Sequence, residues 1–186
     1  MVLIIDCGYK NIHQLEKIVD EYMDYTTLSI FDLNAEQLPN HDGIIISSAA
    51  ITIENESTEK YLEKLKFLTE QNKPVLGIGT GHHLLGLLFD ALPAYQPYKN
   101  EVIPISIIDD CPMFDRLPDE INMRSDHAGT ISIPPNFKLI ASSDSSINEA
   151  MQHRDKPFFG IQFLPELSGN HGSIILENFT KVVLKR

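Results

Sequence analysis

The chain is poor in cysteine, in cations and in long apolar runs, and each shortage excludes a class of protein. Its two cysteines, Cys7 and Cys111, lie far apart without the spacing of metal ligands or of a disulfide framework, which favours a reducing, cytoplasmic setting. The 15 lysines and arginines stand against 26 aspartates and glutamates, and a formal net charge of −11 argues against a nucleic-acid partner, which needs clustered cations. No apolar run approaches the length of a membrane span, and the opening run Met1–Ile5 is too short for a signal-peptide core. We therefore expect neither nucleic acid nor membrane among its partners.

The first half of the chain alternates short apolar runs with amphipathic segments. With 186 residues and 42% apolar content the chain can bury one sizeable core, so we expect a single domain over residues 1–186. The apolar runs predict buried strands over residues 2–5, 26–31, 43–47 and 75–78. Apolar residues at helical spacing predict helices within residues 12–22, 61–68 and 84–88. This alternation predicts an α/β fold with a doubly wound, flavodoxin-like and mostly parallel central sheet.

After Pro93 the pattern changes to short strand-like segments separated by Pro, Asp and Ser turns. We expect a smaller antiparallel or mixed region with strands over residues 102–108, 137–142, 147–151 and 158–163, and a last helix within residues 172–185. Glu54, Glu56 and Glu59 should form a solvated acidic run before the second helix. Residues 94–98 suit either a partner-facing loop or a plain surface turn.

In doubly wound sheets ligands bind beyond the carboxyl ends of the strands, which directs attention to residues 6–9, 47–51 and 79–83. A strand followed by Gly-x-Gly-x-Gly and a helix has the pattern of a nucleophile elbow, a sharp turn that exposes its central residue. Here that residue is Gly79, which offers no nucleophile. A phosphate-binding loop is the rival interpretation, but the spacing fits neither the dinucleotide fingerprint nor the P-loop.

Two motifs resemble the class I glutamine amidotransferases. Gly77-Ile-Gly-Thr-Gly-His-His is similar to the family's Gly-Ile-Cys-x-Gly-His-Gln elbow, with Gly79 in the place of the cysteine. Gly160-Ile-Gln-Phe-Leu-Pro-Glu is similar to the family's Gly-Val-Gln-Phe-His-Pro-Glu, with Leu164 in the place of the catalytic histidine and Glu166 kept. The resemblance therefore implies a catalytic triad of which one member remains.

The resemblance extends over nearly the whole chain and is strongest to the separate glutaminase subunit of GMP synthase, which implies a place in purine metabolism. Ser48 and Ala49 replace both glycines of the family's Ser-Gly-Gly-Pro loop, which helps to form the oxyanion hole. The glutaminase motif Ser-His-x-Asp, which the resemblance links to communication with a synthetase, reads Ser125-Asp-His-Ala128 here. The resemblance implies two kinds of partner, which are a small amide or amino-acid ligand and a synthetase or other protein subunit.

The family reaction is attack by a cysteine thiolate on the glutamine side-chain amide, with a histidine as base and acid. Glycine cannot attack and leucine cannot carry a proton, so we expect a non-catalytic binding or regulatory subunit that uses no cofactor and no metal. Glu166, without an imidazole to orient, should cap or hydrogen-bond a nearby backbone amide. A related alternative is a GMP-synthase-type subunit that has lost its own glutaminase activity and whose ammonia is supplied otherwise.

The other alternative is a hydrolase of an amide or γ-glutamyl compound that uses a substitute nucleophile. Cys7 and Thr80 are the candidate nucleophiles, although packing or turn formation is the favoured role for both. The candidate bases are histidines, for which a capping or surface role is favoured because no metal-ligand spacing occurs. They are His82, His83, His127 and His171.

Overall fold

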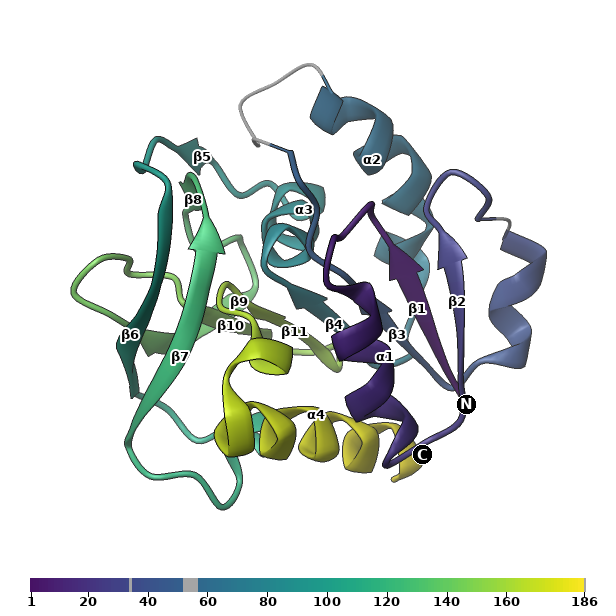
Figure 1. The fold of residues 1–186 in the computed structure, drawn as a ribbon. Coiled ribbons are helices and arrows are strands. Elements are labelled where there is room, and N and C mark those ends of the chain that lie inside the picture. Colours follow the sequence, from purple (N-terminus) through teal and green to yellow (C-terminus); the bar gives the residue numbers. More distant parts are fainter. Residues whose placement is uncertain (34, 52–56, 186) are drawn as a thin grey trace.

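The computed structural model describes residues 1–33, 35–51 and 57–185, so Glu54 and Glu56 lie outside the described residues (Figure 1). Nine of the described strands form one large sheet in the order β2-β1-β3-β4-β11-β10-β9-β6-β7. Its parallel half comprises β2 (Tyr25–Ser29), β1 (Val2–Asp6), β3 (Gly43–Ile46), β4 (Val75–Ile78) and β11 (Phe158–Ile161). Its antiparallel half comprises β10 (Ala150–His153), β9 (Phe137–Ser142), β6 (Lys99–Ile107) and β7 (Glu120–His127). A separate two-stranded sheet pairs β5 (Pro93–Ala94) with β8 (Thr130–Ile131).

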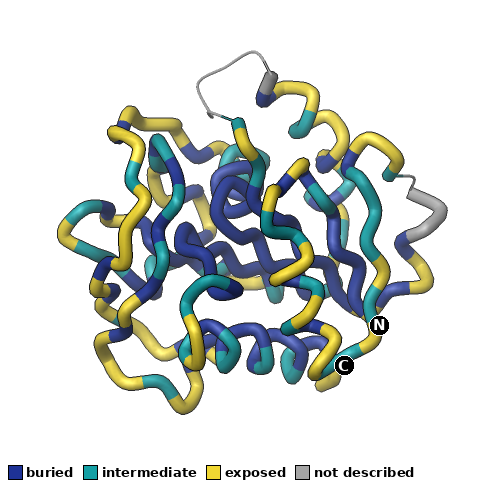
Figure 2. Tube along the Cα trace, in the orientation of Figure 1, coloured by how far each residue is buried: buried dark blue, intermediate teal, exposed yellow. Residues whose placement is uncertain are grey.

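Helices cover both faces of the parallel half (Figure 1). The helices α1 (Ile12–Asp20) and α4 (Gly169–Leu184) pack on one face, and α2 (Ser57–Leu65) and α3 (Thr80–Leu88) pack on the other. Along β1 the side chains alternate, because Val2 and Ile4 face α1 and α4 whereas Leu3 and Ile5 face the opposite side. Figure 2 shows the result, a continuous buried layer through the centre of the molecule. The short 3₁₀ segments are η1 (Ala35–Asn40), η2 (Lys66–Glu70), η3 (Pro112–Phe114) and η4 (Pro165–Leu167).

The predicted α/β fold with a mostly parallel central sheet is confirmed. Several element assignments differ, among them the short strands β5 and β8, which were not predicted. The strand β7 was not predicted, although Ile121 and Met123 are buried and alternate with exposed neighbours along it. The strand expected to begin at residue 147 begins at Ala150, because Ile147 is exposed in the preceding loop. The helix expected over residues 61–68 is α2 followed by the 3₁₀ segment η2.

The fold gathers the three loops singled out from the sequence at one edge of the parallel sheet. The strands β1, β3 and β4 are neighbours and parallel, so the residues that follow them emerge side by side. Within the described part of the chain no helix is long and apolar enough to cross a membrane.

Candidate functional site

The turn between β4 and α3 has the shape of a nucleophile elbow, with Gly79 at its centre. Gly79 has φ +57° and ψ −118°, a conformation that strains any residue with a side chain. Close packing fixes the turn, because a Cβ atom on Gly81 would lie 2.3 Å from the Ile46 carbonyl oxygen and one on Gly77 would lie 2.5 Å from the Gly81 oxygen. Helix α3 therefore starts directly against the end of β3.

The Ser48 side chain fills the space in front of this elbow. The backbone N–H of Thr80 donates a hydrogen bond to Ser48 Oγ at 3.2 Å. In an elbow of this type the N–H of the residue after the nucleophile is one of the oxyanion-hole donors. A Cβ atom on Gly79 would lie only 2.6 Å from Ser48 Oγ. The Ser48 hydroxyl thus crowds the space that a side chain at residue 79 would need, and it engages the N–H that would hold an oxyanion.

Leu164 closes the same space from the other side. Its side chain is 1% exposed, and its Cδ2 would lie 3.0 Å from a Cβ atom on Gly79. Its backbone is fixed to β7 by a hydrogen bond from Leu164 N–H to the Arg124 carbonyl oxygen at 2.8 Å. The positions that the family resemblance assigns to cysteine and histidine are therefore neighbours here, but they meet as an apolar contact without a titratable group.

Glu166 is a buried carboxyl without a hydrogen-bond partner. It is the middle residue of η4, which precedes α4, and it is 7% exposed; neither of its carboxyl oxygens meets a donor at hydrogen-bond geometry among the described residues. The expected interaction with a backbone amide is present with the amide of Glu166 itself, although not at full hydrogen-bond geometry. The Tyr9 hydroxyl and the Glu166 backbone amide lie close enough to lower its pKa but fall outside hydrogen-bond geometry.

Burial is the main influence on the charge of Glu166. Removal of the carboxyl from water raises its pKa from 4.5 to about 7, which exceeds the opposing influence of Tyr9. The phenol of Tyr9 responds in the same way, because burial first and the Glu166 carboxylate second raise its pKa. Near neutral pH Glu166 is thus divided between its protonated and ionised forms.

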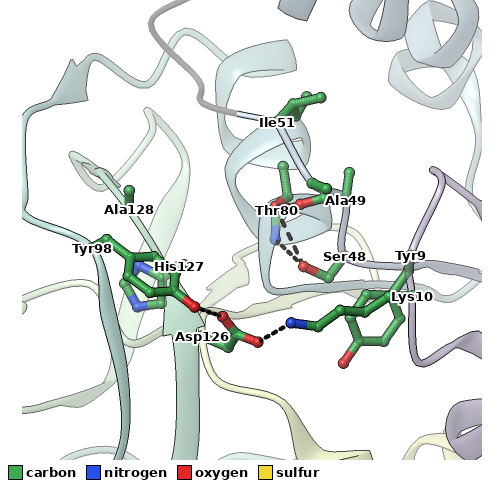
Figure 3. Close-up of a pocket in the computed structure, with 11 residues that line it drawn as sticks. Tyr9, Lys10, Ser48, Ala49, Ile51, Thr80, Tyr98, Asp126, His127 and Ala128 are labelled. Atoms are coloured by element: carbon green, nitrogen blue, oxygen red, sulfur yellow. Dashed lines mark hydrogen bonds and ion pairs between the residues drawn. The ribbon is translucent and has the colours of Figure 1, made fainter.

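A cleft with a volume of about 280 Å³ opens beside the elbow (Figure 3). Of the candidate residues, Ser48, Ala49, Thr80 and His127 line it. The Thr80 hydroxyl donates to the Ala49 carbonyl oxygen at 2.9 Å, so it is engaged by the loop that precedes it. The remaining lining residues are Tyr9, Lys10, Ala50, Ile51, Tyr98, Asp126 and Ala128.

A polar bridge spans the cleft between the segment after β1 and strand β7 (Figure 3). Lys10 Nζ lies 3.1 Å from one Asp126 oxygen, and the Tyr98 hydroxyl donates to the other at 2.7 Å. These partners hold the pKa of Asp126 below its usual value despite its partial burial. Sequence reasoning treated Asp126 only as a departure from the family motif and did not consider Lys10. Lys10 directly follows the predicted loop at residues 6–9, but nothing in the sequence indicated that Asp126 lies opposite it, because strand β7 was not predicted.

Three imidazoles form a chain of ring contacts that begins at the cleft with His127. The ring centroid of His83 lies 5.5 Å from that of His82 and 5.7 Å from that of His127. Burial lowers the pKa of all three, to about 4 for His83 and well below 6.5 for His82. His127 Nδ1 lies 3.1 Å from the Gly129 carbonyl oxygen, so the neutral ring carries its proton there and leaves Nε2 as an acceptor. Of the three, His127 alone is among the cleft-lining residues.

Cys7 and His171 do not line the cleft. Cys7 is 1% exposed, and burial followed by the charge of Asp6 raises its thiol pKa to about 12, which opposes thiolate formation. Across the described ranges no group of three or more His, Cys, Asp or Glu side chains could hold a metal ion. The cleft therefore offers hydroxyls, one imidazole and one ion pair as its polar chemistry.

The sheet order, the glycine elbow and its partner segments define a class of protein. The family model of class I glutamine amidotransferases matches residues 3–183, and the chain belongs to that family. Within it, the chain is related to the glutaminase subunit of GMP synthase. It is 32% identical to a glutamine-hydrolyzing GMP synthase subunit of Pyrococcus furiosus and 30% identical to the Pyrococcus abyssi protein of the same name, over 98% of each chain.

A solved structure supports the same relationship. A Thermoplasma acidophilum protein described as a GMP synthase subunit superposes with a TM-score of 0.91 at 25% sequence identity, covering 99% of this chain and 94% of that one. The suspected membership in the class I family and the similarity to the GMP synthase subunit are thus confirmed.

Proposed function

We propose that the protein is a catalytically inactive relative of the GMP synthase glutaminase subunit, with a binding or regulatory role. The observation that carries the proposal is the hydrogen bond from the Thr80 N–H to Ser48 Oγ. The family reaction needs this region free for a thiolate and for the oxygen of a tetrahedral intermediate. Here Ser48 and Leu164 fill it, and Gly79 has no side chain.

The number of catalytic groups that are absent supports a loss of glutaminase activity rather than a modest decrease. Removal of one member of a nucleophile and base unit costs on the order of 10⁴ to 10⁶ in rate. Both members are absent at Gly79 and Leu164, and the remaining Glu166 has no imidazole to orient. The expected glutaminase rate is therefore at least about 10⁴-fold below that of an intact site.

A protein partner is part of the proposal. The similar Pyrococcus proteins are named as subunits of GMP synthase, and their similarity covers 98% of this chain. We propose that the partner is a synthetase or another protein subunit, while a small amide or amino acid is the ligand of the cleft. A cytoplasmic location and a part in purine metabolism complete the proposal, and two unpaired, buried cysteines suit that location.

One observation favours the alternative of a hydrolase with a substitute nucleophile. His127 presents an unprotonated Nε2, and the hydroxyls of Ser48 and Thr80 line the same cleft. A serine or threonine nucleophile requires an imidazole at hydrogen-bond distance. The hydroxyl of Thr80 instead pairs with Ser48 Oγ and the Ala49 carbonyl, so we rank this activity second.

Covalent labelling separates these two functions. The purified protein is incubated with a chloroketone analogue of glutamine, and its intact mass is measured beside that of the Pyrococcus furiosus relative, which is the positive control. We expect an adduct on the control and none on this protein. An adduct on Thr80, Ser48 or Cys7 would establish a substitute nucleophile and overturn the proposal.

Association with a GMP synthase synthetase subunit tests the partner, by analytical ultracentrifugation at micromolar concentrations. A complex would support a GMP-synthase-type subunit whose ammonia comes from elsewhere. Absence of a complex over the whole concentration range would refute the synthetase as partner.

A further inference from the structure

An apolar groove lies beside the small β5–β8 sheet, outside the cleft already described. It has a volume of about 530 Å³. None of its lining residues carries a charge, although 22% of the chain is charged. These residues are Leu92, Pro93, Ala94, Thr130, Ile131, Ser132, Ile133, Ser145, Ser146, Ile147 and Asn148.

The groove displays large aliphatic side chains to solvent. Leu92 is 71% exposed, Ile147 is 73% exposed and Ile133 is 38% exposed. Exposed apolar residues scattered singly are ordinary, but several around one hollow mark an interaction site. Residues from three separate segments contribute these side chains, so the patch is a product of the fold.

Hydrogen bonds hold the walls of the groove in place. Leu92 and Ser132 are joined twice, by Leu92 N–H to Ser132 Oγ and by Ser132 N–H to the Leu92 oxygen, both at 2.9 Å. Asn148 Nδ2 donates to the Ser132 oxygen at 3.2 Å, and Thr130 Oγ1 lies 3.0 Å from Ser146 Oγ. A partner would therefore meet a preformed surface, which reduces the entropic cost of binding.

Charge indicates what kind of partner suits this surface. Asp90, two residues before Leu92, and Asp144, next to Ser145, are exposed acidic residues that flank the uncharged lining in sequence. Lys99 is not among the lining residues, and its charge acts on His127 and on the buried Glu149. A second copy of the chain would also carry a net charge of −11 and be repelled. Complementarity thus favours a cationic partner.

We propose that this groove docks a protein segment that inserts bulky aliphatic side chains and carries lysine or arginine on both flanks. The aliphatic groups bury against Leu92, Ile133 and Ile147, while the flanking cations face Asp90 and Asp144. The site lies outside the amidotransferase cleft, so it does not depend on whether that cleft is active.

Two synthetic peptides test the proposal with the full-length protein. Both contain the core Leu-Ile-Pro-Leu; one has two lysines on each flank and the other has two glutamates. Fluorescence anisotropy measures their affinities at low ionic strength and at high salt. We expect the lysine peptide to bind at least about tenfold more tightly, with a preference that shrinks as salt screens the charges.

Matched variants locate the binding site. The double change Leu92→Ser and Ile147→Ser should weaken the lysine peptide at least about tenfold, because it removes the two most exposed anchors. Ile108→Ser is the control, since Ile108 is 51% exposed but does not line the groove. Equal affinity for the two peptides, or equal affinity of the double and control variants, would overturn the proposal. Self-association that the double variant abolishes would assign the groove to a second copy and would also overturn it.

Discussion

Replacement of Glu166 by glutamine should make the protein more stable at alkaline pH and should remove a pH dependence near neutrality. Burial raises the carboxyl pKa from 4.5 to about 7. The folded state therefore binds the proton more tightly than the unfolded state does. The extra stability that the bound proton gives the folded state is fully present below pH 4.5 and is lost as the pH rises through 7. At about 1.36 kcal/mol per pKa unit, the ionised carboxyl costs the native state roughly 3 kcal/mol at pH 8.

Urea denaturation of wild type and Glu166→Gln at pH 4.5 and pH 8 measures this cost. The free energy of unfolding of the variant, relative to wild type, should rise by roughly 3 kcal/mol between the two pH values. Glu63→Gln, on an exposed position of α2, controls for the change of carboxyl to amide. If the difference in unfolding free energy between variant and wild type changes by less than about 0.5 kcal/mol between the two pH values, Glu166 is not a desolvated carboxyl and the reasoning is refuted.

Three further outcomes follow from the structure. The double variant Gly79→Cys and Leu164→His should show only very low glutaminase activity. Addition of Ser48→Gly and Ala49→Gly should raise that rate by about 10²-fold, because the Thr80 N–H becomes free to hold an oxyanion. Equal rates of the double and quadruple variants would show that Ser48 is no obstacle. Burial lowers the His83 pKa from 6.5 to about 4, so the stability that the neutral imidazole gives the folded state is present above pH 6.5 and lost as the pH falls through 4. In urea titrations over that range, the free energy of unfolding of the wild type should fall by roughly 3 kcal/mol more than that of His83→Gln. An equal fall in both proteins would contradict this. Cys7 and Cys111, with thiol pKa values raised to about 12 and about 11, should react with a thiol reagent at pH 8 only after unfolding, and stoichiometric labelling of the native protein would disprove their burial.

The inner strands of the parallel half, β1, β3, β4 and β11, could be predicted because they are buried on both faces. Segments such as Ile44-Ile45-Ile46 are therefore apolar at every position and lack the spacing of apolar and polar residues that indicates an amphipathic helix. The strand β7 was missed because its inward side ends in Ser125 and His127, which look like surface residues in sequence. The alternation of Ile121 and Met123 was the signal that was present.

The positions of the proposed degenerate site could be located from sequence, but not how the space between them is filled. Gly79 and Leu164 are identified by motif, whereas the hydrogen bond between Ser48 Oγ and the Thr80 N–H joins loops 32 residues apart. The burial of the Glu166 carboxyl likewise depends on packing around η4, which no local sequence pattern predicts. Sequence reasoning therefore anticipated which chemical groups are missing and could not anticipate what replaced them.

The most direct test of the account is release of ammonia and glutamate from glutamine by the purified protein, alone and with a GMP synthase synthetase present. The Pyrococcus furiosus relative serves as the active comparison and Glu166→Ala as the matched control. The account predicts no release above the background of the Glu166→Ala variant under either condition. Release that the wild type supports and that Glu166→Ala abolishes would contradict it and would show that the cleft contains a working nucleophile.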